Sequence, residues 1–255
     1  MAGPVQSIER AAAILRLLAG GPRRLGLGEV AASLGLAKGT AHGILRTLQH
    51  VDFVEQDAAT GKYQLGAALL HLGTSYLDVN ELRSRSLNWA DALAARSGEA
   101  VRLGTPLEGK VLVIHHVFRP DDTLQTLDTG SLLPLHASSL GKVLLAYGTA
   151  TLEEDPDTGP EAYTRHTLVT AEQLGQALAE VREQGWAAEI QEMIMGEAGV
   201  AAPIRGHGGL VVGALGVSGP VERICDGQGR PWPALITLLR EGARAISRDL
   251  GATRW

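Results

Sequence analysis

Four basic or titratable side chains recur at every fourth position of one short stretch, at Lys38, His42, Arg46 and His50. On a helix this spacing places them along one face, and no Asp or Glu occurs between positions 30 and 51. A basic helix face without acidic residues is suited to contact the phosphates of a nucleic acid. The alternative interpretation is an ordinary solvated helix whose basic residues bind nothing.

Other residues have the chemistry for catalysis or metal binding. Two serines follow His136 in LPLHASSLGK, but the chain has no G-x-S-x-G motif that would place a nucleophile on a sharp turn. His115, His116, His136 and Cys225 are conceivable metal ligands. Adjacent strand residues point to opposite faces, so at most one of the paired histidines serves a given site. We therefore expect no catalytic site, no metal and no cofactor.

The basic face belongs to a segment with the pattern of a winged helix-turn-helix. Residues 29–34 form a short helix, which Gly35 ends because glycine accepts a positive φ. A second helix over residues 38–50 has a buried stripe that consists of Ala41, Ile44, Leu45 and Leu48. Residues 53–56 and 63–65 have the pattern of two short strands joined by a hairpin.

In such a fold the second helix enters the major groove, and the hairpin tip lies beside it. The sequence therefore predicts a DNA-binding domain. Its candidate contact residues are Lys38, Gly39, Thr40, His42, Gly43, Arg46, Thr60 and Lys62.

The net charge of −5 over 255 residues hides an uneven distribution. Residues 1–65 carry seven Lys and Arg against five Asp and Glu, whereas the rest carries 16 against 23. This asymmetry fits a small DNA-facing domain attached to an acidic body. A single cysteine, Cys225, excludes a disulfide framework within the chain. Because no signal peptide or long apolar run is evident, we expect a cytoplasmic protein without membrane contact.

The rest of the chain predicts further helices and strands. The helices are expected at 5–18, 66–77, 79–96, 140–147, 171–184 and 232–250, and the strands at 101–105, 111–117, 123–127, 186–190, 200–204 and 210–217. In the first helix, Ser7 is the expected N-cap and Ile8 and Leu15 the expected core. Residues 153–165 are acidic and predict a surface excursion.

The order of these elements predicts an α+β fold with an antiparallel sheet in the second domain. We expect three parts: a DNA-binding domain at 1–66, a linker helix at 67–80, and an effector-binding and oligomerisation domain at 81–255. The apolar face of residues 67–77 predicts either contact with a second subunit or simple cover for the first domain's own core. Arg102 and His115 would neutralise an anionic effector if their strand faces point inward.

Several segments that follow one another along the chain carry a family resemblance. They are VQSIERAAAILRLL, LAKGTAHGILRTL, LPLHASSLGKVLLA, REQGWAAEIQE and GVAAPIRGHGGLVVGALGVSGPVERI. Together they resemble the IclR family of transcriptional regulators, and AHGILRTL is most similar to regulators of glycerol operons. Many members of that family have Arg directly after the recognition-helix histidine, where this chain has Gly43. Base reading at that position is therefore in question.

The resemblance implies a homodimer or homotetramer that binds double-stranded operator DNA, with a GAF-like C-terminal domain that binds a small effector. The implied effector residues are Ser139, Leu140, Glu189, Gly199, Gly216 and Ser218. Glycerol 3-phosphate or glycerol is the implied effector. The Ser139 helix terminus would hold the anionic end, although Ser139 could equally be an ordinary N-cap. Glu189 would accept hydroxyl hydrogens, but it opposes a nearby phosphate.

Two classes of function fit these observations. The first is a transcriptional regulator, acting as a repressor of a catabolic operon, without enzymatic activity. The second is a metabolite-binding protein or enzyme whose N-terminal domain contacts protein. Only the first accounts for the basic helix and the wing.

Overall fold

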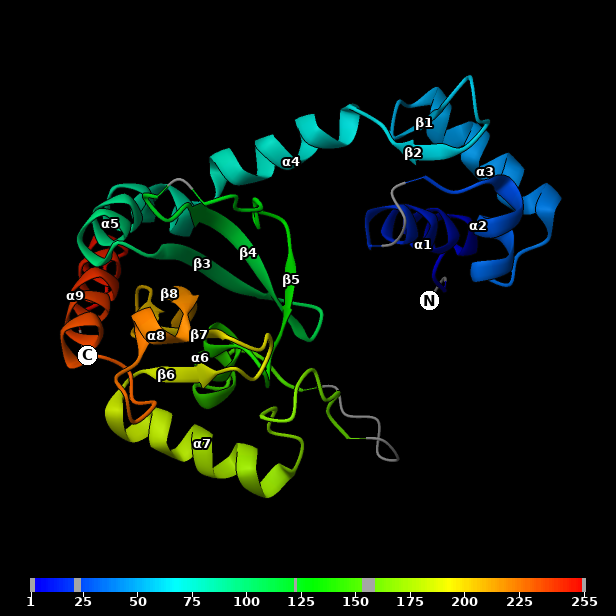
Figure 1. Ribbon diagram of the computed structural model, residues 1–255. Helices are drawn as coiled ribbons and strands as arrows, with labels where there is room; N and C mark the ends of the chain where they lie inside the picture. The colour runs from blue at the N-terminus through cyan, green and yellow to red at the C-terminus, as the bar shows by residue number, and fades with distance from the viewer. Residues whose placement is uncertain (1–2, 21–23, 122, 153–158, 254–255) are drawn as a thin grey trace. The chain divides into compact units, whose positions relative to one another are not determined.

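The computed structural model describes residues 3–20, 24–121, 123–152 and 159–253. The chain divides into two compact units, residues 1–79 and 80–255 (Figure 1). Each unit has a hydrophobic core of its own. The acidic segment expected at 153–165 lies partly outside the described residues, because 153–158 are not among them.

The first unit is a winged helix-turn-helix. It contains α1 (Gln6–Gly20), α2 (Leu27–Ser33), α3 (Lys38–His50), β1 (Val54–Gln56), β2 (Tyr63–Leu65) and α4 (Ala68–Val79). Gly35 has a φ of 60° and turns the chain between α2 and α3, a conformation that costs glycine little. β1 and β2 pair antiparallel with Glu55 opposite Gln64. This arrangement confirms the fold expected for the N-terminal domain.

The core of the first unit differs from the expected core in α1. Ile14, Leu18, Leu45 and Tyr63 are buried together, whereas Ile8 is 67% exposed. The expectation for Ile8 was wrong because the inward face of α1 is centred on Ile14 and Leu18, nearer the middle and end of the helix. Ser7 is not the N-cap either, since the helix already begins at Gln6.

The second unit is built around one antiparallel sheet. Its elements are α5 (Glu81–Ser97), β3 (Ala100–Leu107), β4 (Lys110–Val117), β5 (Leu132–Pro134), α6 (Ser139–Ala146), α7 (Ala171–Gln184), β6 (Ala187–Ile190), β7 (Glu197–Arg205), β8 (Val211–Pro220), α8 (Val221–Ile224) and α9 (Pro233–Asp249). The strand order is β5-β4-β3-β8-β7-β6, and every neighbouring pair is antiparallel. This confirms the expected α+β fold of the second domain.

The two faces of this sheet are covered by different helices (Figure 1). Leu215 of β8 meets α9 at Gly242, while the next residue, Gly216, lies against Leu140 of α6. Successive strand residues point to opposite faces, so α9 and α6 lie on opposite sides. A Cβ at position 216 would lie 3.0 Å from Leu140 Cδ2. Glycine there lets α6 pack close to the sheet.

The strand expected at 123–127 is absent, and the expectation was wrong. This segment is irregular, and Leu124 is fully exposed. Two hydrogen bonds hold this segment in a loop. The Arg119 amide donates to Gln125 Oε1 at 2.8 Å, and Gln125 Nε2 donates to the Arg119 carbonyl at 2.9 Å. On the side away from β3, β4 pairs with β5, a few residues further along the chain.

In the described part of the chain, α-helices are too short or too polar to cross a lipid bilayer.

Candidate functional site

The open face of α3 carries the basic residues that the spacing predicted. Ala41 and Leu45 are fully buried, whereas Lys38, His42 and Arg46 are exposed on the other side of the helix. Ala37 precedes α3 in an extended conformation and provides no side-chain cap. The first amides of a helix lack partners within it, so this end presents N–H donors beside Lys38. Such a terminus is suited to a phosphate group.

Two glycines leave parts of the same face without side chains. A Cβ at Gly39 or Gly43 would meet no atom within 4 Å, so neither glycine is required by packing. Thr40 is half-buried beside them. At position 43 the helix offers its backbone to a partner but no base-reading side chain.

The wing residues are already engaged within the hairpin. The Thr60 hydroxyl donates to Asp57 Oδ1 at 2.9 Å, and Lys62 Nζ lies 3.5 Å from Glu29 Oε2. Both members of that ion pair are exposed, so it is weak and Lys62 can exchange Glu29 for a phosphate. Arg24 bonds to Asp57 at 3.0 Å and adds a cation beside the wing. Arg24 was not predictable from the sequence, because its position depends on the bridge between Leu25 and Tyr63.

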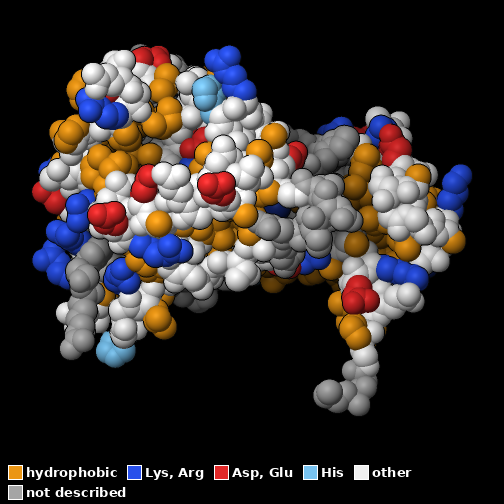
Figure 2. Space-filling model, turned by 90° about the horizontal axis from the view of Figure 1, so that it is seen from below, with side chains coloured by type: hydrophobic (Ala, Val, Ile, Leu, Met, Phe, Trp, Pro, Cys, Tyr) orange, Lys and Arg blue, Asp and Glu red, His pale blue; other side chains and the backbone are white. Residues whose placement is uncertain are grey.

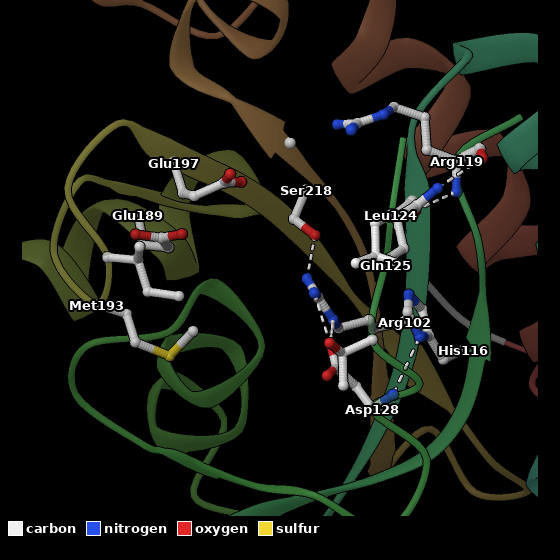
Figure 3. Close-up of a pocket in the computed structure, with 14 residues that line it drawn as sticks. Arg102, His116, Arg119, Leu124, Gln125, Asp128, Glu189, Met193, Glu197 and Ser218 are labelled. Atoms are coloured by element: carbon white, nitrogen blue, oxygen red, sulfur yellow. Dashed lines mark hydrogen bonds and ion pairs between the residues drawn. The ribbon is translucent and has the colours of Figure 1, made fainter. Parts of the chain in front are cut away.

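The second unit contains a cavity of about 350 Å³ on the α6 side of the sheet (Figure 3). This volume is within the range of small-molecule sites. Charged and polar side chains from β3, β4, β6, β7, β8 and the irregular segment after β4 line it, with a few apolar ones. The lining residues are Ala100, Arg102, His116, Arg119, Leu124, Gln125, Thr126, Asp128, Glu189, Met193, Ile194, Glu197, Ser218 and Gly219.

A second, smaller hollow of about 30 Å³ shares four of these residues, namely Arg102, Glu189, Met193 and Ser218. Ser139 and Leu140 of α6 and Gly216 of β8 line it. Its volume is about that of one water molecule, so a metabolite must sit mainly in the larger cavity. Ser138, not Ser139, caps α6, because the Ser138 hydroxyl accepts from the Gly141 amide at 3.1 Å. The Ser139 hydroxyl is therefore not used for capping.

Arg102 lies between two polar partners at the centre of the cavity (Figure 3). Its guanidinium bonds to Asp128 Oδ2 at 2.6 Å and also donates to the Ser218 hydroxyl. Arg119 is likewise paired, with Asp121. Both cations of the cavity thus hold a carboxylate in this structure.

Glu189 lies across the cavity from Arg102 (Figure 3) and is 6% exposed. Burial raises the pKa of its carboxyl to about 7, and the nearby Glu192 carboxylate adds to the rise. The Glu192 amide donates to Glu189 Oε2 at 3.2 Å, which opposes the shift. Glu192 is in turn paired with the buried Lys142 at 2.5 Å. Near neutral pH, Glu189 can therefore act as acceptor or donor.

The paired histidines of β4 face opposite sides of the sheet. His116 lies opposite Arg102 in the strand register and lines the cavity. Its Nδ1 accepts from the Asp128 amide at 3.1 Å, so the neutral ring carries its proton on Nε2. Burial lowers the His116 pKa, and Arg102 adds to this. His115 lies opposite Leu103 on the α5 side, so the structure does not bring it to the cavity.

The structure thus brings most of the candidate effector residues together. Arg102, Glu189 and Ser218 line the cavity, and Ser139, Leu140 and Gly216 line the hollow beside it. Gly199 lies between them, since a Cβ there would be 3.1 Å from Ser139 Oγ and 3.4 Å from Glu189 Oε1.

Sequence reasoning missed other residues that line the cavity on both of its sides, namely His116, Arg119, Gln125, Asp128, Met193 and Glu197 (Figure 3). Arg119, Gln125 and Asp128 lie in or beside the segment that had been expected to form a strand. A clue was the surplus of Asp and Thr around it, which is typical of loops.

The described residues contain no group of three or more His, Cys, Asp or Glu side chains that could hold a metal ion.

Comparison with known proteins covers both units. Residues 7–58 match the family model "IclR helix-turn-helix domain", and residues 74–248 match "Bacterial transcriptional regulator IclR C-terminal". Glycerol operon regulatory proteins from Streptomyces coelicolor and Streptomyces griseus are 54% and 52% identical to the chain over 255 residues, covering all of each sequence. These relatives are named as regulators, not as enzymes.

A solved structure supports the same assignment. The crystal structure of an IclR transcriptional regulator from Alicyclobacillus acidocaldarius matches with a TM-score of 0.81 and 28% identity, covering 96% of this chain and 99% of that one. With its winged helix-turn-helix, its curled antiparallel sheet and these matches, the chain belongs to the IclR family of DNA-binding transcriptional regulators.

Proposed function

We propose that this regulator is a cytoplasmic, homo-oligomeric repressor of a glycerol-utilisation operon. Residues 1–66 bind the operator, residues 67–80 link the domains, and residues 81–255 bind the effector and assemble the oligomer. The names of the Streptomyces relatives support the operon assignment. We assign glycerol or glycerol 3-phosphate as the effector, and the cavity beside Arg102 as its site.

The alternation of donors and acceptors around the cavity supports a small hydroxylated ligand. Arg102, Gln125 and the His116 Nε2–H can donate, while Glu189, Glu197 and Asp128 can accept. A hydroxyl group both donates and accepts, so it can bridge two such groups. This lining is the observation that carries the effector assignment.

A phosphate group would have to compete for a cation. It must share Arg102 with Asp128, or Arg119 with Asp121. Protonation of Glu189 near pH 7 would reduce the repulsion between its carboxyl and a phosphate. Binding of glycerol 3-phosphate would therefore depend on this competition and on the protonation of Glu189, whereas glycerol carries no phosphate group.

The DNA-binding assignment places N-terminal residues of α3 in the major groove, with Arg46 on phosphate. Lys38, Thr40 and His42 would lie near base edges. Thr60 and Lys62 of the wing would contact the flanking backbone after Lys62 leaves Glu29.

The oligomer assignment rests on exposed apolar side chains of the first unit. Leu70 of α4 is 75% exposed, and Leu72 and Ile8 are exposed as well. The side chains of residues 74–79 lie outside the description. Exposed apolar clusters are typical of subunit contacts. Sedimentation at micromolar concentration should give a dimer or tetramer, and a monomer with full operator affinity would contradict the assignment.

Calorimetry and gel shift together test the effector assignment. Glycerol or glycerol 3-phosphate should bind the full-length protein and release a DNA fragment from upstream of its operon. Arg102→Gln should weaken effector binding about tenfold, the loss of one charge-assisted hydrogen bond. Arg96→Gln is the matched control, since Arg96 pairs with Glu241 on an exposed surface. No heat from either compound would refute the effector assignment. An equal loss of effector affinity in both variants would show that the effector does not bind beside Arg102.

A further inference from the structure

A second concave site lies in the second unit, apart from the effector cavity. It has a volume of about 280 Å³ and is formed by the end of α7, the ends of α6 and β7, and the middle of α9. None of the residues lining it lines the effector cavity. Four arginines face this site, Arg182, Arg205, Arg240 and Arg244, against one acidic residue, Glu183. Figure 2 shows Lys and Arg side chains gathered on this side of the larger unit.

Three of these arginines, Arg182, Arg205 and Arg240, are not explained by ion pairs with the described residues. In the described part of the chain, no carboxylate lies within ion-pair distance of Arg182, Arg205 or Arg240. Other arginines of the same unit do form ion pairs, as Arg102 does with Asp128 and Arg119 with Asp121. The site is therefore an unusual concentration of positive charge in an otherwise acidic domain.

The end of α7 accounts for only part of this charge. Arg182 lies in its last turn, and Arg240 comes within 3.9 Å of where a Cβ on Gly185 would be. A helix C-terminus is equivalent to about half a negative charge. With Glu183 included, Arg182, Arg205 and Arg240 still leave an excess of more than one positive charge at the site, which a bound anion would neutralise.

Two contacts within the fold hold the Arg205 guanidinium in place beside the site. Its guanidinium stacks on the Tyr147 ring at 4.8 Å, and one terminal nitrogen donates to the Gly209 carbonyl at 2.9 Å. Its Nε is buried without a partner among the described residues. A buried donor without an acceptor is costly. The second terminal nitrogen of Arg205 has no hydrogen-bond partner among the described residues, and an oxyanion in the site would supply it with the acceptor that a guanidinium prefers.

We propose that this site binds a phosphate-type oxyanion through Arg205 and Arg240, separately from the effector. The volume is roughly that of nine water molecules, so the anion can be free phosphate or the phosphoryl group of a small metabolite. Tyr147 would lie against the remainder of such a metabolite.

Calorimetry on the full-length protein tests this with three probes: inorganic phosphate, pyrophosphate and glucose 6-phosphate, with chloride as the control anion. One site per chain is expected. Preference for glucose 6-phosphate would assign a metabolite, and preference for the inorganic anions would assign free phosphate. Absence of heat from all three would overturn the proposal.

Variants locate the binding. Arg240→Gln and Arg205→Gln should each weaken binding about tenfold or more, and Arg240→Lys should weaken it less because the charge remains. Arg230→Gln, which alters an exposed arginine paired with Asp226, should bind as the wild type does. If Arg205→Gln fails to fold, Arg240→Gln decides. Unchanged phosphate binding in Arg240→Gln would overturn the proposal. So would loss of operator affinity in the variants if the wild-type protein binds none of the phosphates.

Discussion

Replacing Glu189 with glutamine should make the second unit more stable at pH 8 and leave its stability at pH 4 almost unchanged. Glu189 is buried, and its pKa is raised to about 7 from an ordinary value of 4.5. The folded state therefore favours the protonated carboxyl. Glutamine keeps the shape, and its carbonyl can still accept the Glu192 amide that now donates to Glu189.

The size of the effect follows from the shift. Between pH 4.5 and about 7, the folded protein holds a proton on Glu189 that the unfolded chain has released. The free energy of unfolding therefore falls as pH rises through this window and levels off above it. Each pKa unit corresponds to about 1.4 kcal/mol, so the total is about 3 kcal/mol. The glutamine variant cannot undergo this loss.

Tryptophan fluorescence isolates the relevant unit, because all four tryptophans lie after residue 80. Urea unfolding of wild type and Glu189→Gln should be followed from pH 4 to pH 8. The difference between the two proteins cancels other titrating groups that do not interact with Glu189. Equal pH dependence in both proteins, or a variant that is less stable than wild type at pH 8, would refute the assignment of a raised pKa to burial.

Two further predictions concern other charged residues. Arg46→Ala should weaken binding to operator and random DNA by the same factor and reduce the salt slope by about 0.9. Fluorescence anisotropy at several salt concentrations measures this, and a loss confined to the operator would contradict a phosphate contact. Lys142→Met should destabilise the second unit by about 3 kcal/mol or more, because Glu192 would remain buried without its cation. Adding Glu192→Gln should restore part of that loss in urea unfolding, and no recovery would exclude this cause.

Much of the fold was predictable because its signals are local. The turn at Gly35 and the buried stripe of α3 each depend on a few adjacent residues. These elements therefore appear at or near their expected bounds. The strand expected at 123–127 failed for the opposite reason. β5 pairs with β4 instead, and strand pairing is decided by the rest of the sheet.

The candidate site was predictable only in part, because a strand's inward face is not visible in its sequence. The alternation of side chains along a strand predicts that His115 and His116 point to opposite faces. Which of them lines the cavity is decided by the packing of α5 and α6. Glu189, Ser139 and Ser218 were identified through family resemblance. Arg119 and Gln125 were missed because they lie in a segment whose path depends on their own mutual hydrogen bonds.

The charges of the cavity also explain why residue types alone do not identify its ligand. Arg102 is satisfied by Asp128 and Ser218 before any ligand enters, so a ligand gains only the difference between its own bonds and those it replaces. An anion must compete with a carboxylate for the guanidinium, while a hydroxyl can join the existing pair without breaking it. The selectivity of such a site depends on how well the ligand's hydrogen bonds replace those between the protein's own side chains. That depends on the geometry of the folded chain.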